Sequence, residues 1–156
     1  PLPGQEANVM DYTRHLIATN GTIQHWVLGG HSRGGAIATR FVAADPDLFA
    51  ALILIGTSHP KEAAFDLSSA GLPVLKIYAT RDGLASVAEI EETSRFLPKD
   101  TTWVRIEGGN HSQFGYIGTL LGDQRATISR AEQQDLTLSA ILSMLKAVDQ
   151  QRNAGS

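Results

Sequence analysis

A serine flanked by glycines stands where an apolar run gives way to a helix-like segment. The heptapeptide GGHSRGG holds Ser32 between Gly30 and Gly34 in a G-x-S-x-G pattern. A strand that turns sharply into a helix while presenting one side chain needs small neighbours, and it holds that residue at a strained, positive φ. Such a turn lifts the Ser32 hydroxyl clear of a sheet and places the backbone N–H of Arg33 at a helix N-terminus, where it can stabilise an oxyanion. The pattern predicts a nucleophilic serine.

A serine nucleophile needs a base to take its proton and an acid to orient that base. Both residue types follow later apolar runs: Asp82 comes just after one run, and His111 follows the next on a glycine-rich loop. The order Ser32, Asp82, His111, each after a successive strand, predicts a triad for acyl transfer. No metal or organic cofactor is needed for that chemistry.

Three plainer interpretations stay open. The pattern around Ser32 can be only a glycine-rich turn between a strand and a helix, and Asp82 can be only a turn residue before Gly83. Glu107 can replace Asp82 as the orienting acid, although it lies next to the histidine loop rather than after the preceding strand.

The other histidines fit the role of base less well. His15 lies on a predicted helix, His25 precedes a strand, and His59 comes before a proline in a predicted loop. His31 adjoins the nucleophile, but neighbouring side chains diverge at such a turn. We therefore expect His31 to pack or hydrogen-bond locally.

The segment after His111 is rich in aromatic residues. We predict that Phe114 and Tyr116 bind substrate, with Ile117 beside them; the alternative is that they pack the loop against the core. Asp123 and Arg125 could pair near the site, although a solvated pair contributes little.

Two arginines next to the catalytic candidates raise a question of substrate charge. Arg33 and Arg81 could favour an acidic substrate, or they could be ordinary surface residues. The segment 57–71, between two of the apolar runs, is too short for a large cap domain over the site. We therefore expect an open site suited to small substrates.

Four short apolar runs can form the strands that position these residues. They are residues 26–28, 51–55, 74–79 and 103–106. Each lacks polar alternation over most of its length, which is typical of strands buried on both faces of a parallel sheet. Helical patterns lie between them, and the alternation of strands with helices predicts a doubly wound α/β fold.

Local signals place the helices. Three-to-four-residue periodicity predicts a helix over residues 9–17, and capping-box spacing predicts helices over 87–97 and 132–148. In the last helix one set of residues forms an apolar stripe, which we expect to cover the sheet. Its members are Leu138, Ile141, Leu142, Leu145 and Val148.

The composition is that of one globular domain. The 156 residues are 42% hydrophobic and 19% charged, and we expect a single domain over residues 1–149 with a frayed tail at 150–156. A net charge of −3 argues against a nucleic-acid partner. The chain has no cysteine, which excludes disulfides, thiolate metal sites and a cysteine nucleophile. The apolar runs are too short to span a membrane.

Three motifs together resemble a known family. GGHSRGG, YATRDG and GGNHSQFG resemble blocks of α/β-hydrolase-fold proteins, and GGNHSQFG is similar to that family's GGNHAQFG. The resemblance runs from about Trp26 to the last helix. It implies an α/β-hydrolase fold, a mostly parallel doubly wound sheet flanked by helices, with Ser32, Asp82 and His111 as the triad and carboxylic esters as substrates.

The chain departs from that family before the nucleophile strand. Complete members carry several strands there, whereas 25 residues precede Trp26 in this sequence, enough for one helix. Without those strands an apolar edge stays unpaired, which folded proteins normally avoid. The loop that supplies a second oxyanion N–H is also missing, a loss worth about a hundredfold or more in rate. We predict that the sequence is the C-terminal portion of a longer domain: either a fragment, or one piece of a nicked molecule whose partner is the N-terminal segment of the same protein.

These observations lead to one predicted function and several alternatives. The prediction is a serine hydrolase that cleaves small carboxylic esters through an acyl-enzyme. A thioesterase, amidase or acyltransferase would use the same residues. A hydrolase-like binding or scaffold domain without catalysis, or an incomplete fragment, are the alternatives of another class. The oligomeric state and the cellular compartment are not predicted.

Overall fold

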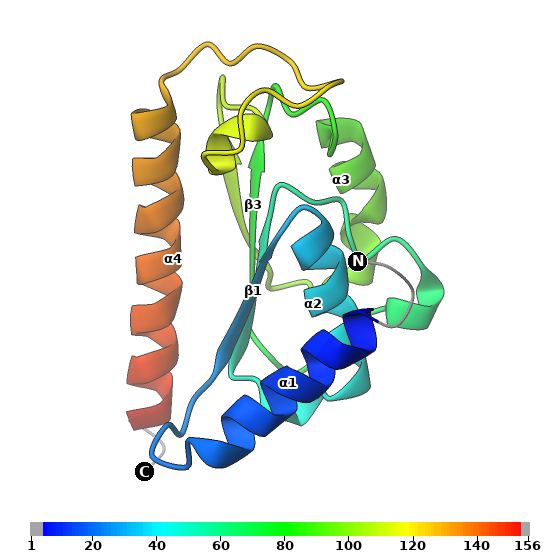
Figure 1. Ribbon diagram of the computed structural model, residues 1–156, viewed down its shortest axis with the longest axis vertical. Coiled ribbons are helices and arrows are strands. Elements are labelled where there is room, and N and C mark those ends of the chain that lie inside the picture. The colour runs from blue at the N-terminus through cyan, green and yellow to red at the C-terminus, as the bar shows by residue number, and fades with distance from the viewer. Residues whose placement is uncertain (1–4, 154–156) are drawn as a thin grey trace.

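Four parallel strands form one sheet in the computed structural model, which describes residues 5–153 (Figure 1). They are β1 (Val27–His31), β2 (Ala51–Ile55), β3 (Val74–Ala79) and β4 (Thr102–Ile106), and their order in the sheet is β1-β2-β3-β4. Because the strands are all parallel, their carboxyl ends meet at one edge of the sheet. The segments after β1, β3 and β4 therefore lie near one another.

Helices cover both faces of this sheet. They are α1 (Gln5–Thr19), α2 (Arg33–Ala44), α3 (Val87–Thr93) and α4 (Arg130–Asn153). Figure 1 shows α1, α2 and α3 on one face and α4 on the other. This arrangement confirms the doubly wound α/β fold. None of the helices in the described part of the chain is long and apolar enough to cross a membrane.

The helix boundaries follow their capping signals at the N-terminal ends. The Ser86 hydroxyl accepts a hydrogen bond from the Glu89 backbone N–H, and the Glu89 carboxylate accepts one from the Ser86 N–H. This capping box starts α3, which ends at Thr93 rather than Leu97 and continues as a 3₁₀ turn. The last helix extends to Asn153, into the segment expected to be frayed, and residues 154–156 lie outside the described residues.

The core is divided by the sheet into two apolar clusters. One packs β2 and β3 against α2, with Phe41 and Val42 buried, and the other packs the opposite face against Met144 and Val148 of α4. The central strands β2 and β3 are buried on both faces, as expected. The prediction was wrong for β1 and β4, which are only partly buried because each has a strand on one side only.

The apolar stripe predicted for the last helix is also wrong in part. Val148 is buried and Ile141 packs against the core, but Leu138, Leu142 and Leu145 are exposed. The helix instead turns a partly polar face inward, since Gln133 and Thr137 are buried there with their side chains hydrogen-bonded. Apolar content alone could not show which face of α4 lies against the sheet, because that face is set by hydrogen bonds to the loop that follows β4.

Candidate active site

The backbone at Ser32 has the strained geometry expected for a nucleophile turn. Ser32 has φ 53° and ψ −119°, and it is the only non-glycine residue with a positive φ in the described part of the chain. A Cβ on Gly30 would collide with the backbone of Gly34, and one on Gly35 would collide with the Thr57 side chain. The glycines therefore permit the close approach of β1 and α2. Gly34 itself has open space around it.

The turn at Ser32 is hydrogen-bonded to β2, and it places the N-terminus of α2 next to the Ser32 side chain. The Ser32 N–H donates a hydrogen bond of 2.9 Å to the carbonyl of Ile55, at the end of β2. Arg33 is the first residue of α2, so its backbone N–H belongs to the positive end of the helix dipole. An oxyanion formed at Ser32 would lie close to that end.

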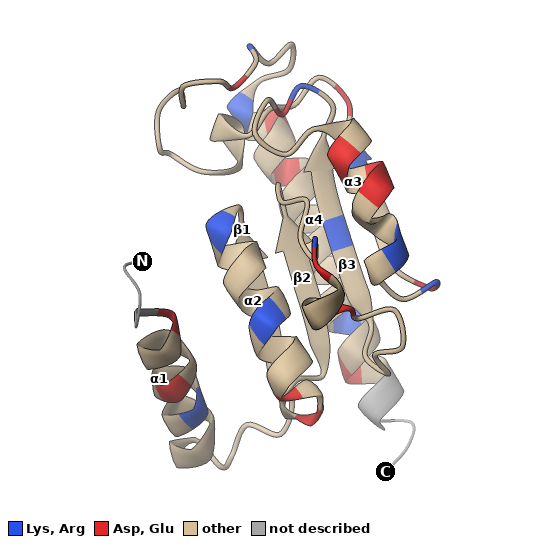
Figure 2. Ribbon diagram, turned by 90° about the vertical axis from the view of Figure 1, so that its right-hand side faces the viewer, with Lys and Arg blue, Asp and Glu red and all other residues tan. Residues whose placement is uncertain are grey.

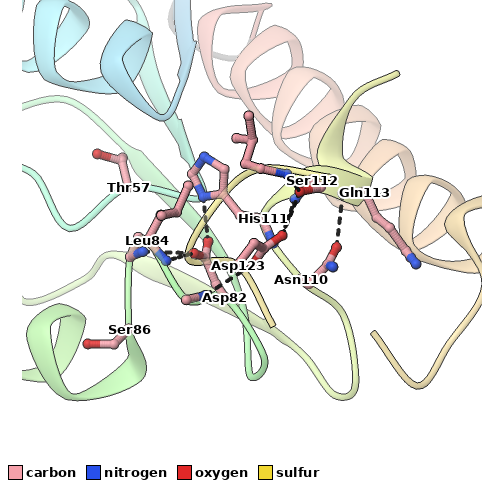
Figure 3. Close-up of polar contacts among 12 residues, drawn as sticks. Thr57, Asp82, Leu84, Ser86, Asn110, His111, Ser112, Gln113 and Asp123 are labelled. Atoms are coloured by element: carbon pink, nitrogen blue, oxygen red, sulfur yellow. Dashed lines mark hydrogen bonds and ion pairs between the residues drawn. The ribbon is translucent and has the colours of Figure 1, made fainter. Parts of the chain in front are cut away.

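Asp82 and His111 form a buried hydrogen-bonded pair. His111 Nδ1 lies 2.8 Å from Asp82 Oδ2, and the residues are 1% and 2% exposed. The other carboxylate oxygen, Oδ1, accepts the backbone N–H groups of Leu84 at 2.8 Å and Ala85 at 2.7 Å. Figure 3 shows the second ring nitrogen of His111 directed away from Asp82. Backbone N–H groups of the loop that follows Asp82 thus hold its carboxylate in place. The carboxylate can therefore orient the imidazole of His111.

Glu107 does not take the place of Asp82. Its carboxylate pairs with Arg105 at 2.5 Å and is mostly exposed to solvent. His15 and His25 are exposed, whereas His59 lines the cavity described next.

Ser32 and His111 line the same cavity, which has a volume of about 410 Å³. His111 Nε2 is buried and has no hydrogen-bond partner among the residues described, so the structure shows no hydrogen bond between it and the Ser32 hydroxyl. Catalytic hydrogen bonds are often long or poorly aligned without substrate. The two groups share one cavity, and the nitrogen that does not contact Asp82 is the one left for a proton from the serine.

His31 packs against the catalytic histidine. Its ring centroid lies 4.7 Å from that of His111 and 5.7 Å from that of Phe114. Burial lowers the pKa of the His31 imidazole, and the neighbouring His111 lowers it further, while Asp82 acts in the opposite direction. His31 therefore supports the His111 ring by packing as a neutral group, which agrees with the expected local role.

The two aromatic residues expected at the substrate site lie elsewhere. Phe114 packs between the core and His31, and Tyr116 is 83% exposed with the Arg130 guanidinium over its ring. Neither lines the cavity that holds Ser32. The prediction that they bind substrate is thus not supported, because the loop after His111 turns outward at Tyr116.

Asp123, considered from the sequence only as a partner of Arg125, lies between the two loops that carry the catalytic candidates. Its carboxylate accepts hydrogen bonds from the backbone N–H groups of His111 at 3.2 Å, Ser112 at 2.8 Å and Gly83 at 3.1 Å. The Ser112 hydroxyl donates another at 2.7 Å. One side chain therefore ties the loop of Asp82 to the loop of His111 (Figure 3).

The electrostatics of Asp123 agree with this role. Burial raises the pKa of its carboxyl, but the hydrogen bonds from Ser112, Gly83 and His111 outweigh burial and lower the pKa below its usual value. The pairing of Asp123 with Arg125 that the sequence left open is absent from the described residues; the Arg125 carbonyl instead accepts a hydrogen bond from Arg81. An aspartate directly after Gly122 in a loop is a turn signal, and that signal could have marked Asp123 as a residue that binds backbone N–H groups.

A buried glutamine fixes the other side of the histidine loop. Gln133 of α4 accepts the Asn110 backbone N–H at 3.0 Å and donates to the Asn110 carbonyl at 2.7 Å. A Cβ on Gly109 would collide with this side chain. The glycine before Asn110 is therefore needed so that α4 can hold the loop that carries His111.

The described residues contain no group of three His, Asp or Glu side chains placed to hold a metal ion. What they do contain is a strained serine, a helix N-terminus, and a histidine held by a buried carboxylate, all at the carboxyl edge of a parallel sheet. These are the parts needed for nucleophilic attack on an acyl carbon.

Comparison with known proteins agrees with this architecture. A search of curated protein sequences found no match. A predicted CIB-like hydrolase from Thermoplasma acidophilum has a TM-score of 0.61 at 18% identity, over 72% of this chain and 54% of that one. A monoacylglycerol lipase from Paleococcus ferrophilus has a TM-score of 0.57 at 16% identity, over 70% and 68%. The hydrolase MGS-MChE2, from a lagoon-sediment metagenome in Morocco, has a TM-score of 0.59 at 20% identity, over 72% and 64%.

At these identities the similarity concerns the fold. The chain spans between about half and two thirds of the length of these three structures. The sequence profile of the alpha/beta hydrolase family matches residues 8–135, which is most of the chain. The chain belongs to the alpha/beta hydrolase family.

Proposed function

We propose that this chain hydrolyses small carboxylic esters, with Ser32 as nucleophile, His111 as general base and Asp82 as the orienting acid. The observation that carries the proposal is the buried 2.8 Å hydrogen bond between His111 and Asp82 beside the cavity that Ser32 lines. If Asp82 and His111 served only to stabilise the fold, the strained backbone of Ser32 at the same cavity would have no explanation. One structural neighbour, the monoacylglycerol lipase, bears the name of an ester hydrolase.

Acylation follows from the placement of these groups. Asp82 holds the tautomer of His111 that carries its proton on Nδ1, which leaves Nε2 to accept the Ser32 proton. The Ser32 oxygen bonds to the ester carbon, and the carbonyl electrons move to oxygen, where the Arg33 N–H can donate a hydrogen bond. When the tetrahedral intermediate collapses, the alcohol leaves with the proton from His111 and an acyl-Ser32 remains.

Deacylation repeats the sequence with water as nucleophile. His111 takes a proton from water, the resulting hydroxide oxygen bonds to the acyl carbon, and Ser32 leaves with the proton. The Asp82 carboxylate stabilises the imidazolium in both half-reactions. The cavity of about 410 Å³ and the short segment after β2 support small substrates.

A fluorophosphonate probe tests the nucleophile directly. We expect one covalent adduct, located at Ser32 by intact mass and peptide mapping. Labelling should be lost in Ser32→Ala and strongly reduced in His111→Ala. Adducts at other residues, or equal labelling of both variants, would contradict the assignment. Thioesters, amides and alternative acyl acceptors, assayed alongside a simple ester, then separate the activities that use the same residues.

A binding domain without catalysis is the second candidate. The observation that favours it is the absence of a hydrogen bond from His111 Nε2 to Ser32 in the described chain. A folded sample that turns over no ester and takes up no probe would support this candidate over the hydrolase.

A further inference from the structure

The wall of the Ser32 cavity carries more positive than negative charge. Its cationic lining residues are Arg33, Arg40 and Lys61, and its one carboxylate is Glu6. The whole chain, in contrast, has a formal charge of −3. Figure 2 shows that the charged positions along α2 are all basic. The cavity is therefore a basic region on an acidic protein.

Two of these cations, Arg40 and Lys61, are partly exposed to solvent. Arg40 pairs with Glu6 at 2.7 Å, and Lys61 pairs with Glu89 at 3.1 Å, yet more than a third of each basic side chain is exposed. A lysine ammonium has three donors and an arginine has five, so one carboxylate leaves donors for a ligand. Both side chains can therefore bind an additional anion.

The basic side chains of the cavity also act on a neighbouring imidazole. Burial lowers the pKa of His59, and Lys61, Lys76 and Arg40 lower it further, against the opposite effect of Glu62. His59 lines the same cavity. His59 therefore has Lys61 and Arg40 near it, the two basic side chains that line this cavity with it.

The cavity offers little apolar surface to a long acyl chain. Only Ala36, Leu84 and Ala85 contribute apolar side chains to its lining among the residues described. Pockets that bind apolar ligands are lined mainly by hydrophobic and aromatic side chains. The wall is better suited to a short, polar substrate.

We propose that the substrate of this site is a short ester that carries a carboxylate away from the scissile bond, bound by Lys61 and Arg40. The inference rests on the proposed ester hydrolysis and adds a substrate class to it. Charge-assisted hydrogen bonds to a carboxylate are shorter and stronger than neutral ones, and positive walls in a cleft also concentrate anions from solution. The carboxylate anchors the substrate while its ester carbonyl faces Ser32.

Two esters of matched size test this inference. Monoethyl succinate and ethyl butyrate differ mainly in a terminal carboxylate in place of a methyl group, and both release ethanol. We would measure kcat/KM for each and take the ratio of the anionic to the neutral ester. We expect the ratio to exceed one, to fall by up to about fivefold in Lys61→Gln, as for a partly exposed ion pair, and to fall with added salt.

Two control variants show whether a change in the ratio comes from the charge at Lys61. Lys99→Gln removes the same charge from an exposed position that lines a separate cavity beside β4, and the ratio should stay unchanged. Lys61→Arg should restore the ratio because it restores the charge. An equal ratio in wild type and Lys61→Gln, or an equal fall in Lys99→Gln, would overturn the inference.

Labelling separates the two proposals. If the fluorophosphonate probe modifies Ser32 while the ratio does not respond to Lys61→Gln, ester hydrolysis stands and the carboxylate preference is wrong. If a folded sample takes up no probe and releases ethanol from neither ester, the proposed function fails and this inference fails with it.

Discussion

Lys76 is a buried amine whose ionisation should control the stability of this chain. It lies on β3, is 1% exposed, and its Nζ donates a hydrogen bond of 2.6 Å to the His59 carbonyl. Burial lowers the pKa of Lys76 to about 7 from 10.5, and repulsion from Lys61 adds to the effect. Between pH 7 and 10.5 the folded chain therefore binds fewer protons at Lys76 than the unfolded chain does.

The size of this effect follows from proton linkage. At about 1.4 kcal/mol per tenfold difference in proton affinity, the lowered pKa of Lys76 costs about 4 kcal/mol of folding free energy at pH 7. Between pH 7 and 10.5 the unfolded state binds more protons, so the free energy of unfolding rises with pH in this window. By pH 9.5 the remaining cost is about 1 kcal/mol, so the folded chain gains about 3 kcal/mol of stability between these pH values.

Lys76→Met removes the amine and keeps most of the apolar stem. At pH 7 we expect the variant to be more stable than wild type by about 3 kcal/mol, which allows about 1 kcal/mol for the lost hydrogen bond to His59. Urea unfolding at pH 7 and pH 9.5 gives the comparison, and wild type should gain about 3 kcal/mol relative to the variant.

An exposed lysine supplies the control. Lys146→Met, on the outer side of α4, removes the same charge without changing a buried group. If the difference between wild type and Lys76→Met is the same at both pH values, Lys76 keeps its proton through this range and the reasoning from burial is refuted.

Four further substitutions test the supports of the site. Asp123→Asn should lower kcat/KM by about tenfold or more through misplacement of His111, and an unchanged rate of fluorophosphonate labelling would contradict this. Gln133→Leu leaves the Asn110 N–H and carbonyl unpaired and should cost about 2–4 kcal/mol in urea unfolding; a loss below about 1 kcal/mol would contradict it. Gly30→Ala should destabilise the chain severely, whereas Gly34→Ala has room on α2 and should be neutral or stabilising by up to about 1 kcal/mol. Equal melting temperatures for these two variants would refute the account of the turn.

The local parts of the fold could be predicted from the sequence. Residues 51–55 and 74–79 are strands with the expected bounds, and the capping box at Ser86 starts a helix. Hydrophobic runs, caps and the glycines around Ser32 determine conformation within a few residues, so they can be recognised without the rest of the chain. The division into one domain over residues 1–149, and an N-terminal segment as partner, stay predictions.

The supports of the catalytic candidates depend on distant parts of the chain. Gln133 holds a loop 23 residues away, and Asp123 joins two loops that follow different strands. The inward face of α4 was predicted wrongly in part, for the same reason. Periodicity indicates that a helix has an apolar side, but hydrogen bonds to the histidine loop decided which side faces the sheet.

The sequence by itself determined the strained serine turn, the order Ser32, Asp82, His111 and the alternation of strands with helices, because each rests on short-range backbone preferences and on residue chemistry. Only the tertiary structure decided that Asp82 rather than Glu107 contacts His111, and that Lys61 and Arg40 line the cavity of the serine. These contacts depend on which segments the parallel register of the strands brings to one edge of the sheet. The distance between the residues along the chain does not reveal which of them will meet.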